Sequence, residues 1–411
     1  MKITDFTKQP DVLKLINELK DEGIPNKQFS DLLDADGNQY VELVMEGGGV
    51  LGVALVGYNF VLEQVGLRFF SLAGTSAGSI NALLLAGLGD VSKPKAEKLV
   101  QILANKDLME FVDGDDDAQD FVKALVKGAG ILKMIWKGVQ VVDNIKNDIG
   151  LNPGNDFLEW MIDILKTNGI ESVADLDERF GTMPPGLKIR EGINKTLDGL
   201  KPRFSVIGAD LTTETKVEFP HMAGLYWNDA KSVNPAIFVR ASMSVPYFFE
   251  PLMIRDIPQG AGAKKKWKDL VSFNGKVPRE AFFVDGGIMS NFPVDIFHKR
   301  NVVPRLPTFG VRLGVDRDSA NEISGPGNLF GAMFNSIRHL HDYDFILKNP
   351  EYKLLLEKID IGKHDWLNFA MEDKDKVDLF LRGAQAAARF LRKFNWEEYK
   401  EVRRKKMEAS L

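Results

Sequence analysis

The residue best placed for covalent chemistry in this chain is Ser76, at the centre of the pentapeptide Gly74-Thr-Ser-Ala-Gly78. Residues 67–72 before it are typical of a short buried strand, and the residues after it carry an apolar helical pattern. A sharp strand-to-helix turn lifts a serine hydroxyl above the sheet edge, and glycines on either side let strand and helix pass closely. The pentapeptide therefore predicts a nucleophilic serine. The alternative is a plain turn of small residues.

A glycine-rich loop precedes this pentapeptide by one strand-helix unit. It follows a core strand at 40–45 and contains Gly47, Gly48, Gly49 and Gly52. Such a loop can form an anion cradle from backbone N–H groups. Three of these glycines also fit the dinucleotide pattern, but that site needs an acidic residue at the end of the next strand. The next strand runs into Ala73-Gly-Thr-Ser76 instead. We therefore expect the loop to be an oxyanion hole for Ser76.

A carboxylate that could serve as a base comes much later in the chain. Residues 280–284 are typical of a buried strand, and Asp285, Gly286 and Gly287 follow it directly. In a parallel sheet, catalytic groups gather at the carboxyl ends of strands. The pattern favours Asp285 as a catalytic residue, although an Asp-Gly turn is also common outside active sites.

The composition excludes several classes of protein. The chain has 411 residues, 44% of them apolar, a net charge of -5 and no cysteine. The acidic balance argues against nucleic acid as a partner. The absence of cysteine excludes disulfides, thiolate chemistry and cysteine-ligated zinc. No apolar run is long enough for a membrane span, and residues 1–10 do not resemble a signal peptide. We expect a soluble, cytoplasmic protein.

The order of elements predicts an α/β fold with a doubly wound, mostly parallel central sheet flanked by helices. The expected strands are 40–45, 67–72, 204–210, 215–219, 237–240, 280–284 and 308–313. The expected parts are a helical extension at 1–37, a catalytic domain at 38–318 and a helical region at 319–411 packed on the core. Within the catalytic domain, 94–176 is expected to be a helical cap without strands, and 253–279 a basic insertion loop.

Two segments could contact a membrane surface. Residues 120–149 predict a basic amphipathic helix, and the loop around Lys264–Lys268 places Trp267 among lysines. For the helix we favour a cap on its own domain, and for the loop a solvated insertion. The tail at Arg403–Lys406 is expected to be a solvated helix end.

Three separated motifs together resemble the patatin-like phospholipases. They are the glycine loop at 46–52, the serine pentapeptide continued by Ser79-Ile-Asn-Ala82, and Asp285-Gly-Gly287 continued by Ser290-Asn-Phe-Pro-Val294. The block Ala241-Ser-Met-Ser-Val-Pro246 also resembles a segment of that family. The resemblance extends from about residue 41 to residue 313 and implies a three-layer α/β/α fold.

The resemblance implies a Ser-Asp dyad in which Ser76 is the nucleophile and Asp285 the base. Gly47, Gly48 and Gly49 would donate N–H groups to the oxyanion, and the supporting turn glycines would be Gly52, Gly74, Gly78, Gly286 and Gly287. The implied reaction is hydrolysis of phospholipid ester bonds, of phospholipase A or lysophospholipase type, without metal or cofactor. Peripheral membrane contact and an activating partner are further expectations, and nucleic acid is not expected.

One departure from the family pattern and two alternatives remain open. Leu51 stands where the family usually has arginine or lysine, so activity could be reduced or differently directed. An α/β-hydrolase with a Ser-His-Asp triad would need His339, His341 or His364, whereas His298 is expected to have a packing or surface role. A binding module that has kept the fold without catalysis is the second alternative.

Overall fold

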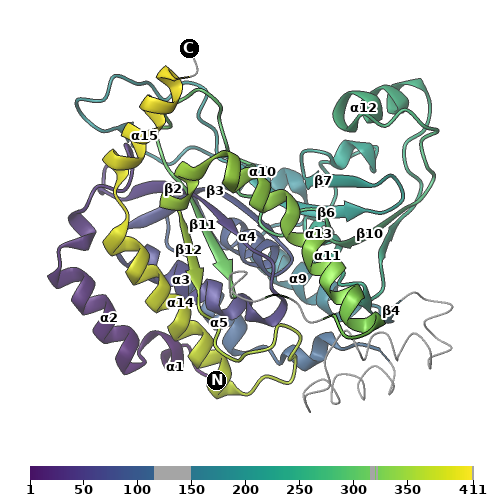
Figure 1. Cartoon of the computed structure of the whole chain (residues 1–411), viewed down its shortest axis with the longest axis horizontal. Helices are drawn as coiled ribbons and strands as arrows, with labels where there is room; N and C mark the ends of the chain where they lie inside the picture. The colour runs from purple at the N-terminus through teal and green to yellow at the C-terminus, as the bar shows by residue number, and fades with distance from the viewer. Residues whose placement is uncertain (115–149, 315–319, 321–322, 410–411) are drawn as a thin grey trace.

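The computed structural model describes residues 1–114, 150–314, 320 and 323–409 (Figure 1). Its centre is a ten-stranded sheet whose main path has the order β12-β11-β2-β3-β6-β10-β9, with β1, β5 and β7 off this path. The bounds of these strands are β1 (Leu32–Leu33), β2 (Gln39–Met45), β3 (Leu67–Thr75), β5 (Lys188–Ile189), β6 (Phe204–Asp210), β7 (Thr215–Phe219), β9 (Leu252–Ile254), β10 (Ala281–Asp285), β11 (Thr308–Leu313) and β12 (Leu356–Ile359). A separate parallel pair joins β4 (Gly150–Asn152) to β8 (Tyr247–Phe249).

The five strands from β12 to β6 run parallel, and β10, β9 and β7 are antiparallel to their neighbours. Parallel strands are usually buried on both faces, and β2, β3 and β6 are almost continuously buried. The prediction of an α/β fold with a mostly parallel central sheet flanked by helices is confirmed.

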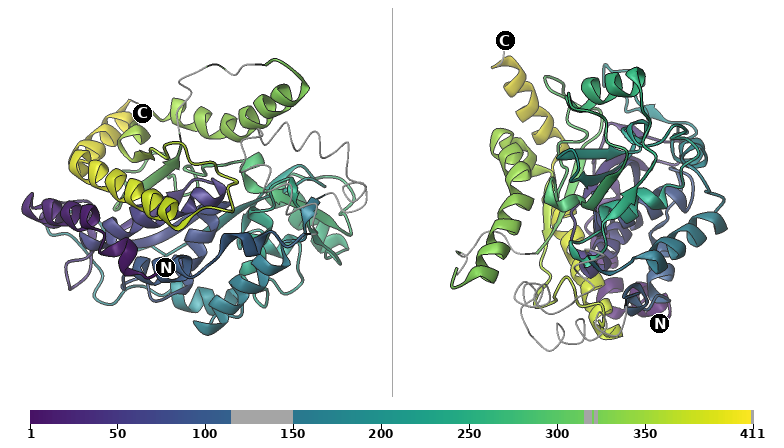
Figure 2. Two further views of the ribbon diagram at one scale, coloured as in Figure 1. Left: turned by 90° about the horizontal axis from the view of Figure 1, so that it is seen from below. Right: turned by 90° about the vertical axis from the view of Figure 1, so that its right-hand side faces the viewer.

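Helices lie on both sides of this sheet (Figure 2). Their bounds are α1 (Thr4–Thr7), α2 (Pro10–Asp21), α3 (Gly52–Gln64), α4 (Ala77–Gly87), α5 (Ala96–Ala104), α9 (Asn155–Thr167), α10 (Val173–Phe180), α11 (Ala236–Ser242), α12 (Ala261–Val271), α13 (Pro326–Lys348), α14 (Asp373–Lys393) and α15 (Trp396–Glu408). Short 3-10 turns include η2 (Gly49–Leu51), η3 (Leu108–Phe111) and η5 (Gly286–Ile288). In the described part of the chain, no helix combines the length and apolarity needed to cross a membrane.

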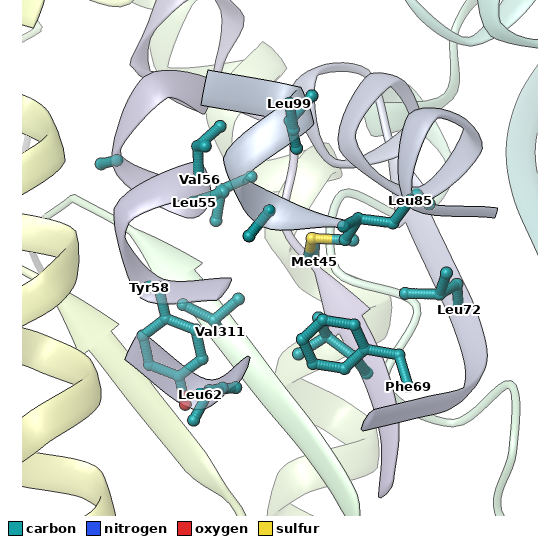
Figure 3. Packing of buried hydrophobic residues seen from close by; sticks show 14 of the residues in the cluster. Met45, Leu55, Val56, Tyr58, Leu62, Phe69, Leu72, Leu85, Leu99 and Val311 are labelled. Atoms are coloured by element: carbon teal, nitrogen blue, oxygen red, sulfur yellow. The ribbon is translucent and has the colours of Figure 1, made fainter. Parts of the chain in front are cut away.

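The main core holds α3 and α4 against the sheet. Figure 3 shows Met45 and Phe69 from the strands beside Leu55 and Tyr58 of α3 and Leu85 of α4. Both helices are apolar nearly all round, which is typical of helices buried on every side. Because the glycine loop leads into α3 and the serine pentapeptide leads into α4, both functional turns are anchored in this core.

The C-terminal region is packed on the core, as expected, but it is not wholly helical. Its helix α14 crosses α3 so closely that a Cβ added to Gly57 would lie 2.0 Å from the Phe380 carbonyl oxygen. A Cβ on Gly383 would lie 1.8 Å from the Ala54 carbonyl oxygen. The same region contributes β12 to the central sheet, beside β11. The prediction of a purely helical 319–411 was therefore wrong.

Other expectations about elements also need correction. Residues 237–240 form part of helix α11 rather than a strand, and Pro235 immediately precedes that helix. The region 94–176 contains β4, which was not expected. The N-terminal extension contributes β1, which pairs with β2. The amphipathic helix expected at 120–149 lies outside the described residues.

The segment around Lys264–Lys268 is helix α12 and not a loop. Trp267 is fully buried, in edge-to-face contact with Tyr226 and Phe273 in a second apolar cluster, while the neighbouring lysines are exposed. The helical turn explains the difference, because it directs one side chain inward and its neighbours outward. The tail at Arg403–Lys406 was expected to be solvated, but Arg403 is buried and paired with Glu351.

Candidate active site

Ser76 occupies the turn between β3 and α4, as the spacing predicts. Its φ is 50° and its ψ is -118°, a conformation that costs energy for a residue with a Cβ. The flanking glycines permit this turn. A Cβ on Gly74 would lie 2.3 Å from the Gly78 carbonyl, and a Cβ on Gly78 would lie 2.1 Å from the Met45 carbonyl oxygen. The strained serine is thus held where strand, helix and the end of β2 converge.

Asp285 ends strand β10, which runs in the opposite direction to β3 and ends at the same place in the sheet. Strand β6 pairs with β7 along one edge, so its other edge carries β3 and β10 in succession. Thr75, the last residue of β3, lies opposite Ile207, and Asp285, the last residue of β10, lies opposite Gly208. The two strands therefore meet end to end, and their terminal residues occupy adjacent positions along one strand. This arrangement brings Ser76 and Asp285 into one site.

The close meeting of the two strands depends on Gly286. A Cβ at this position would lie 2.0 Å from the Ile207 carbonyl oxygen and 3.1 Å from Thr75 Cγ2. The next glycine orients the carboxylate, because the Gly287 N–H donates to Asp285 Oδ1 at 2.7 Å. Thr75 Oγ1 also donates to the Ser290 carbonyl at 2.9 Å, which ties the two turns together.

Two serines at the end of α11 and just beyond it support both catalytic candidates. The Ser76 N–H donates to Ser242 Oγ at 2.9 Å, and the Asp285 N–H donates to the Ser244 carbonyl at 2.7 Å. Ser244 also bonds the buried Arg240, whose guanidinium donates to the carbonyls of Pro153, Gly154 and Glu250. Burial lowers the pKa of Arg240 to about 10, so it remains charged near neutral pH. Sequence reasoning marked this block without giving it a role.

The glycine loop runs past Ser76 and offers two backbone donors. The Gly47 N–H already donates to the Asn291 carbonyl at 3.0 Å, which argues against its predicted part in the oxyanion hole. The N–H groups of Gly48 and Gly49 make no hydrogen bond to another residue in the described part of the chain. Gly49 has a φ of +55°, and a Cβ there would lie 2.1 Å from the Trp366 carbonyl oxygen.

Leu51, where the resemblance would have a cation, is a buried residue of this loop. A different cation lies near the start of the loop, since Arg312 Nε is 3.6 Å from Glu46 Oε1. Glu46 in turn accepts the Leu313 N–H at 2.6 Å. The loop therefore begins at a buried ion pair that no sequence pattern indicated, because its partners come from β11.

An apolar cavity opens beside Ser76. Its volume is about 80 Å³, and it is lined by the glycine loop, the first turns of α3 and α4, and side chains from α5, η3 and α9. Leu367 and Phe369, from the segment before α14, complete the wall. The cavity places an apolar space next to Ser76, as an acyl chain would require.

Among the residues whose side chains the structure describes, the histidines lie elsewhere, and the side chains of the triad candidates His339 and His341 lie outside that described part. None of the residues described around this cavity is a histidine. His298 Nδ1 is 2.8 Å from the Tyr352 hydroxyl, and burial together with nearby cations lowers the pKa of His298 to about 4. His364 Nε2 is 2.8 Å from Asp378 Oδ2. These contacts favour the packing role expected for His298 and give no support to a triad through His364.

The comparison with known protein families identifies the family of this chain. Residues 43–298 match the family described as "Patatin-like phospholipase". An uncharacterised protein of Bacillus subtilis (strain 168), YqhO, is 28% identical over 368 residues, which cover 87% of this chain and all of YqhO. Among solved structures, VipD from Legionella pneumophila aligns over 89% of this chain and 71% of its own, with 14% identity and a TM-score of 0.41.

Proposed function

Because this chain belongs to the patatin-like phospholipase family, a family of lipid acyl hydrolases, we propose that it cleaves carboxylic ester bonds of phospholipids through a Ser76–Asp285 dyad. The observation that carries the proposal is the end-to-end meeting of β3 and β10 on β6. It brings a strained serine and a buried carboxylate together beside an apolar cavity.

The first half-reaction forms an acyl-serine. Ser76 Oγ attacks the ester carbonyl carbon while its proton passes to the Asp285 carboxylate. The N–H groups of Gly48 and Gly49 donate to the developing oxyanion, and the N-terminus of α4 adds its positive dipole end. The tetrahedral intermediate collapses, the bond to the alcohol breaks, and Asp285 returns the proton to the leaving oxygen.

The second half-reaction releases the fatty acid. Asp285 takes a proton from water, whose oxygen attacks the acyl carbon, and the same two N–H groups bind the oxyanion. The bond to Ser76 Oγ then breaks and the serine recovers its proton. No step needs a metal ion.

The decisive test is fatty-acid release from mixed phospholipid vesicles by wild type, Ser76→Ala and Asp285→Asn. We expect each substitution to lower kcat by roughly 10⁴ to 10⁶, as in other hydrolases whose catalytic groups act as a unit. The matched control is Ser205→Ala, a buried serine of β6 that hydrogen-bonds Glu218. Turnover that survived in Ser76→Ala would overturn the mechanism. EDTA is expected to have no effect.

The alternative is a lipid- or protein-binding module without catalysis. Leu51 favours this alternative, because it stands where the family usually has arginine or lysine. A wild-type protein that bound phospholipid vesicles but released no fatty acid from phospholipids or short esters would favour this alternative.

Contact with an anionic membrane surface is the accompanying proposal. Lys264, Lys265, Lys266 and Lys268 are exposed on α12, whereas Trp267 is buried and is not part of the contact. Changing the four lysines to glutamate should weaken sedimentation with anionic vesicles, because each basic residue near such a surface contributes about 1 kcal/mol. If sedimentation did not change, the proposal that α12 contacts the membrane would be wrong. A cytoplasmic location, an activating partner and a part for residues 120–149 stay predictions.

A further inference from the structure

Residues 290–294 continue the Asp285-Gly-Gly287 motif but take no direct part in the proposed reaction. Asn291 lies among them and is buried, with 2% of its surface exposed. Its backbone carbonyl accepts the Gly47 N–H at 3.0 Å, and its side-chain Nδ2 donates to the Gly47 carbonyl at 3.2 Å. One residue therefore holds both backbone polar groups of Gly47, the first glycine of the glycine loop.

The bond to the Gly47 carbonyl has a direct effect on the Gly48 N–H. Both groups belong to one planar peptide unit, and in a trans peptide its C=O and N–H point in opposite directions. This peptide is trans, because the cis bond found among the described residues is Phe219-Pro220. Since the two groups can only rotate together, the amide that holds the Gly47 carbonyl also sets the direction of the Gly48 N–H.

The surroundings of Gly47 leave little room for another arrangement. A Cβ added to Gly47 would lie 2.5 Å from Asn291 Oδ1 and 3.2 Å from Ser76 Cβ. Gly47 is therefore closely packed against both the Asn291 amide and Ser76. If this amide were lost or displaced, the loop could shift relative to Ser76, and a misplacement of about 1 Å in such a site can cost about 100-fold in rate.

Asn291 is itself held in place by Asp342 of α13. This buried carboxylate accepts the Ser290 hydroxyl at 2.9 Å through Oδ1 and the Phe292 N–H at 2.7 Å through Oδ2. Because these two residues flank Asn291, one carboxylate restrains the chain on both sides of it. The same segment begins at Asp285, so it carries the proposed base at one end and the support of the glycine loop at the other.

We propose that Asn291 is a positioning residue for the oxyanion hole, whose amide holds the Gly47 peptide so that the Gly48 N–H meets the developing oxyanion. The inference rests on the proposed function, since it takes the glycine loop to be the oxyanion donor. Asn291 does not line the cavity beside Ser76, so it acts through the loop and not by contact with the substrate.

The first test uses Asn291→Leu and Asn291→Asp, which are close to asparagine in size but lack its amide donor. With nitrophenyl butanoate we expect kcat to fall about 10- to 100-fold and KM to change less than about 3-fold, because an oxyanion donor stabilises the transition state and not bound substrate. The matched control is Asn168→Leu, since Asn168 Nδ2 also donates to a backbone carbonyl, that of Ile164 at 2.8 Å, at the C-terminal end of α9. Its kcat should stay at the wild-type value.

A pair of ketones separates the effect on the oxyanion from a general loss of binding. With hexyl trifluoromethyl ketone, Ser76 Oγ adds to the carbonyl carbon, the serine proton passes to Asp285, and the carbonyl oxygen becomes an oxyanion. Hexyl methyl ketone has the same chain but is far less electrophilic. In Asn291→Leu we expect the Ki of the fluorinated ketone to rise about 10- to 100-fold and that of the plain ketone to stay unchanged. An equal loss for both ketones would overturn the positioning role.

Hydrogen exchange of residues 46–52, followed by mass spectrometry, tests the loop without catalysis. The N–H groups of Gly47, Val50 and Leu51 are hydrogen-bonded there, and we expect them to exchange faster in Asn291→Leu and Asn291→Asp but not in Asn168→Leu. Unchanged exchange in Asn291→Asp would overturn the inference even if Asn291→Leu does not fold. An active wild type whose kcat survives both substitutions of Asn291 would overturn it as well. Absence of hydrolysis by wild type, together with faster exchange in the Asn291 variants, would overturn the proposed function alone.

Discussion

At the scale of single residues, Ser76 is held by one hydrogen bond to a distant part of the chain and one from the first turn of α4. Ser242 Oγ accepts the Ser76 N–H, and the Ser79 hydroxyl donates to the Ser76 carbonyl at 2.6 Å. Both bonds fix the backbone of a residue whose φ of 50° is unfavourable. The serine hydroxyl can therefore keep its direction without relaxing into an ordinary helix start.

Removing one of these supports should affect both catalysis and stability. In Ser242→Ala the Ser76 N–H loses its acceptor, and we expect kcat to fall about 10-fold and unfolding free energy to fall by about 1–2 kcal/mol. Ser71→Ala is the control, because Ser71 Oγ accepts the Arg203 N–H in the middle of β3, away from Ser76. Urea unfolding measures the stability of each variant and ester hydrolysis measures its kcat. Together they should distinguish Ser242→Ala from Ser71→Ala. Equal losses of kcat would contradict a positioning role for Ser242.

The sequence indicated the residues that make up the motifs but not the residues that support them. Ser76 and Asp285 were recognisable because their neighbouring glycines follow from steric crowding at a turn. Ser242 and Arg240 were not, since their bonds to Ser76 and Gly154 join positions far apart in the chain. The Gly47 N–H was expected to be available, and only its contact with Asn291 shows otherwise.

At the scale of elements, the direction of β10 was the feature that sequence patterns could not supply. A buried strand ending in Asp285 is visible in the sequence, but parallel and antiparallel strands share the same apolar pattern when both faces are covered. If β10 were parallel, as expected, Asp285 would lie at the edge of the sheet where the carboxyl ends of parallel strands gather. The observed antiparallel strand brings it there because β6 continues past the end of β3.

Misassigned elements have similar causes. Ile237, Phe238 and Val239 have high strand propensity, yet they form α11 because Phe238 and Val239 are buried against neighbouring elements. Residues 253–279 are rich in lysine and glycine, which favoured a loop, but α12 forms around the buried Trp267. In both segments, tertiary packing determined the secondary structure.

The contact between α3 and α14 makes a prediction at this scale. Gly57→Ala would place a methyl group 2.0 Å from the Phe380 carbonyl oxygen, so the helices must separate, and we expect a loss of about 2–4 kcal/mol. Gly262→Ala in α12 is the control, because nothing lies within 4 Å of its added Cβ. That variant should gain up to about 1 kcal/mol from helix propensity. Thermal or urea unfolding would measure both, and a neutral Gly57→Ala would contradict the close crossing.

At the scale of the whole molecule, stability should respond to the ionisation of Glu42. This residue of β2 lines a cavity of about 260 Å³, and its Oε2 accepts the Thr308 hydroxyl at 2.5 Å. Burial raises the pKa of Glu42 from 4.5 to about 7, against the opposing effects of Thr308 and nearby cations. The folded protein thus holds this proton more tightly than the unfolded chain does.

The resulting stabilisation is complete below about pH 4.5 and is lost as the pH rises through about 7. Glu42→Gln cannot ionise, so at about pH 8.5 we expect it to be more stable than wild type by about 1–3 kcal/mol, with the difference shrinking toward pH 4.5. Urea unfolding across this range measures the difference. Exposed Glu398→Gln is the control. A stability difference between Glu42→Gln and wild type that grew as the pH fell would contradict this prediction.

The wall of the cavity is completed by residues that come late in the chain. Ser76, Asp285 and the glycine loop all precede residue 290, but the Val50 N–H is held by the Trp366 carbonyl, and Leu367 and Phe369 complete the wall of the cavity. A ribosome making this chain therefore releases the reactive residues well before the residues that complete their surroundings. Until Phe369 has emerged and β12 has joined the sheet, a nascent chain lacks the finished site. Under the proposed function, the hydrolytic site would therefore be completed only late in synthesis.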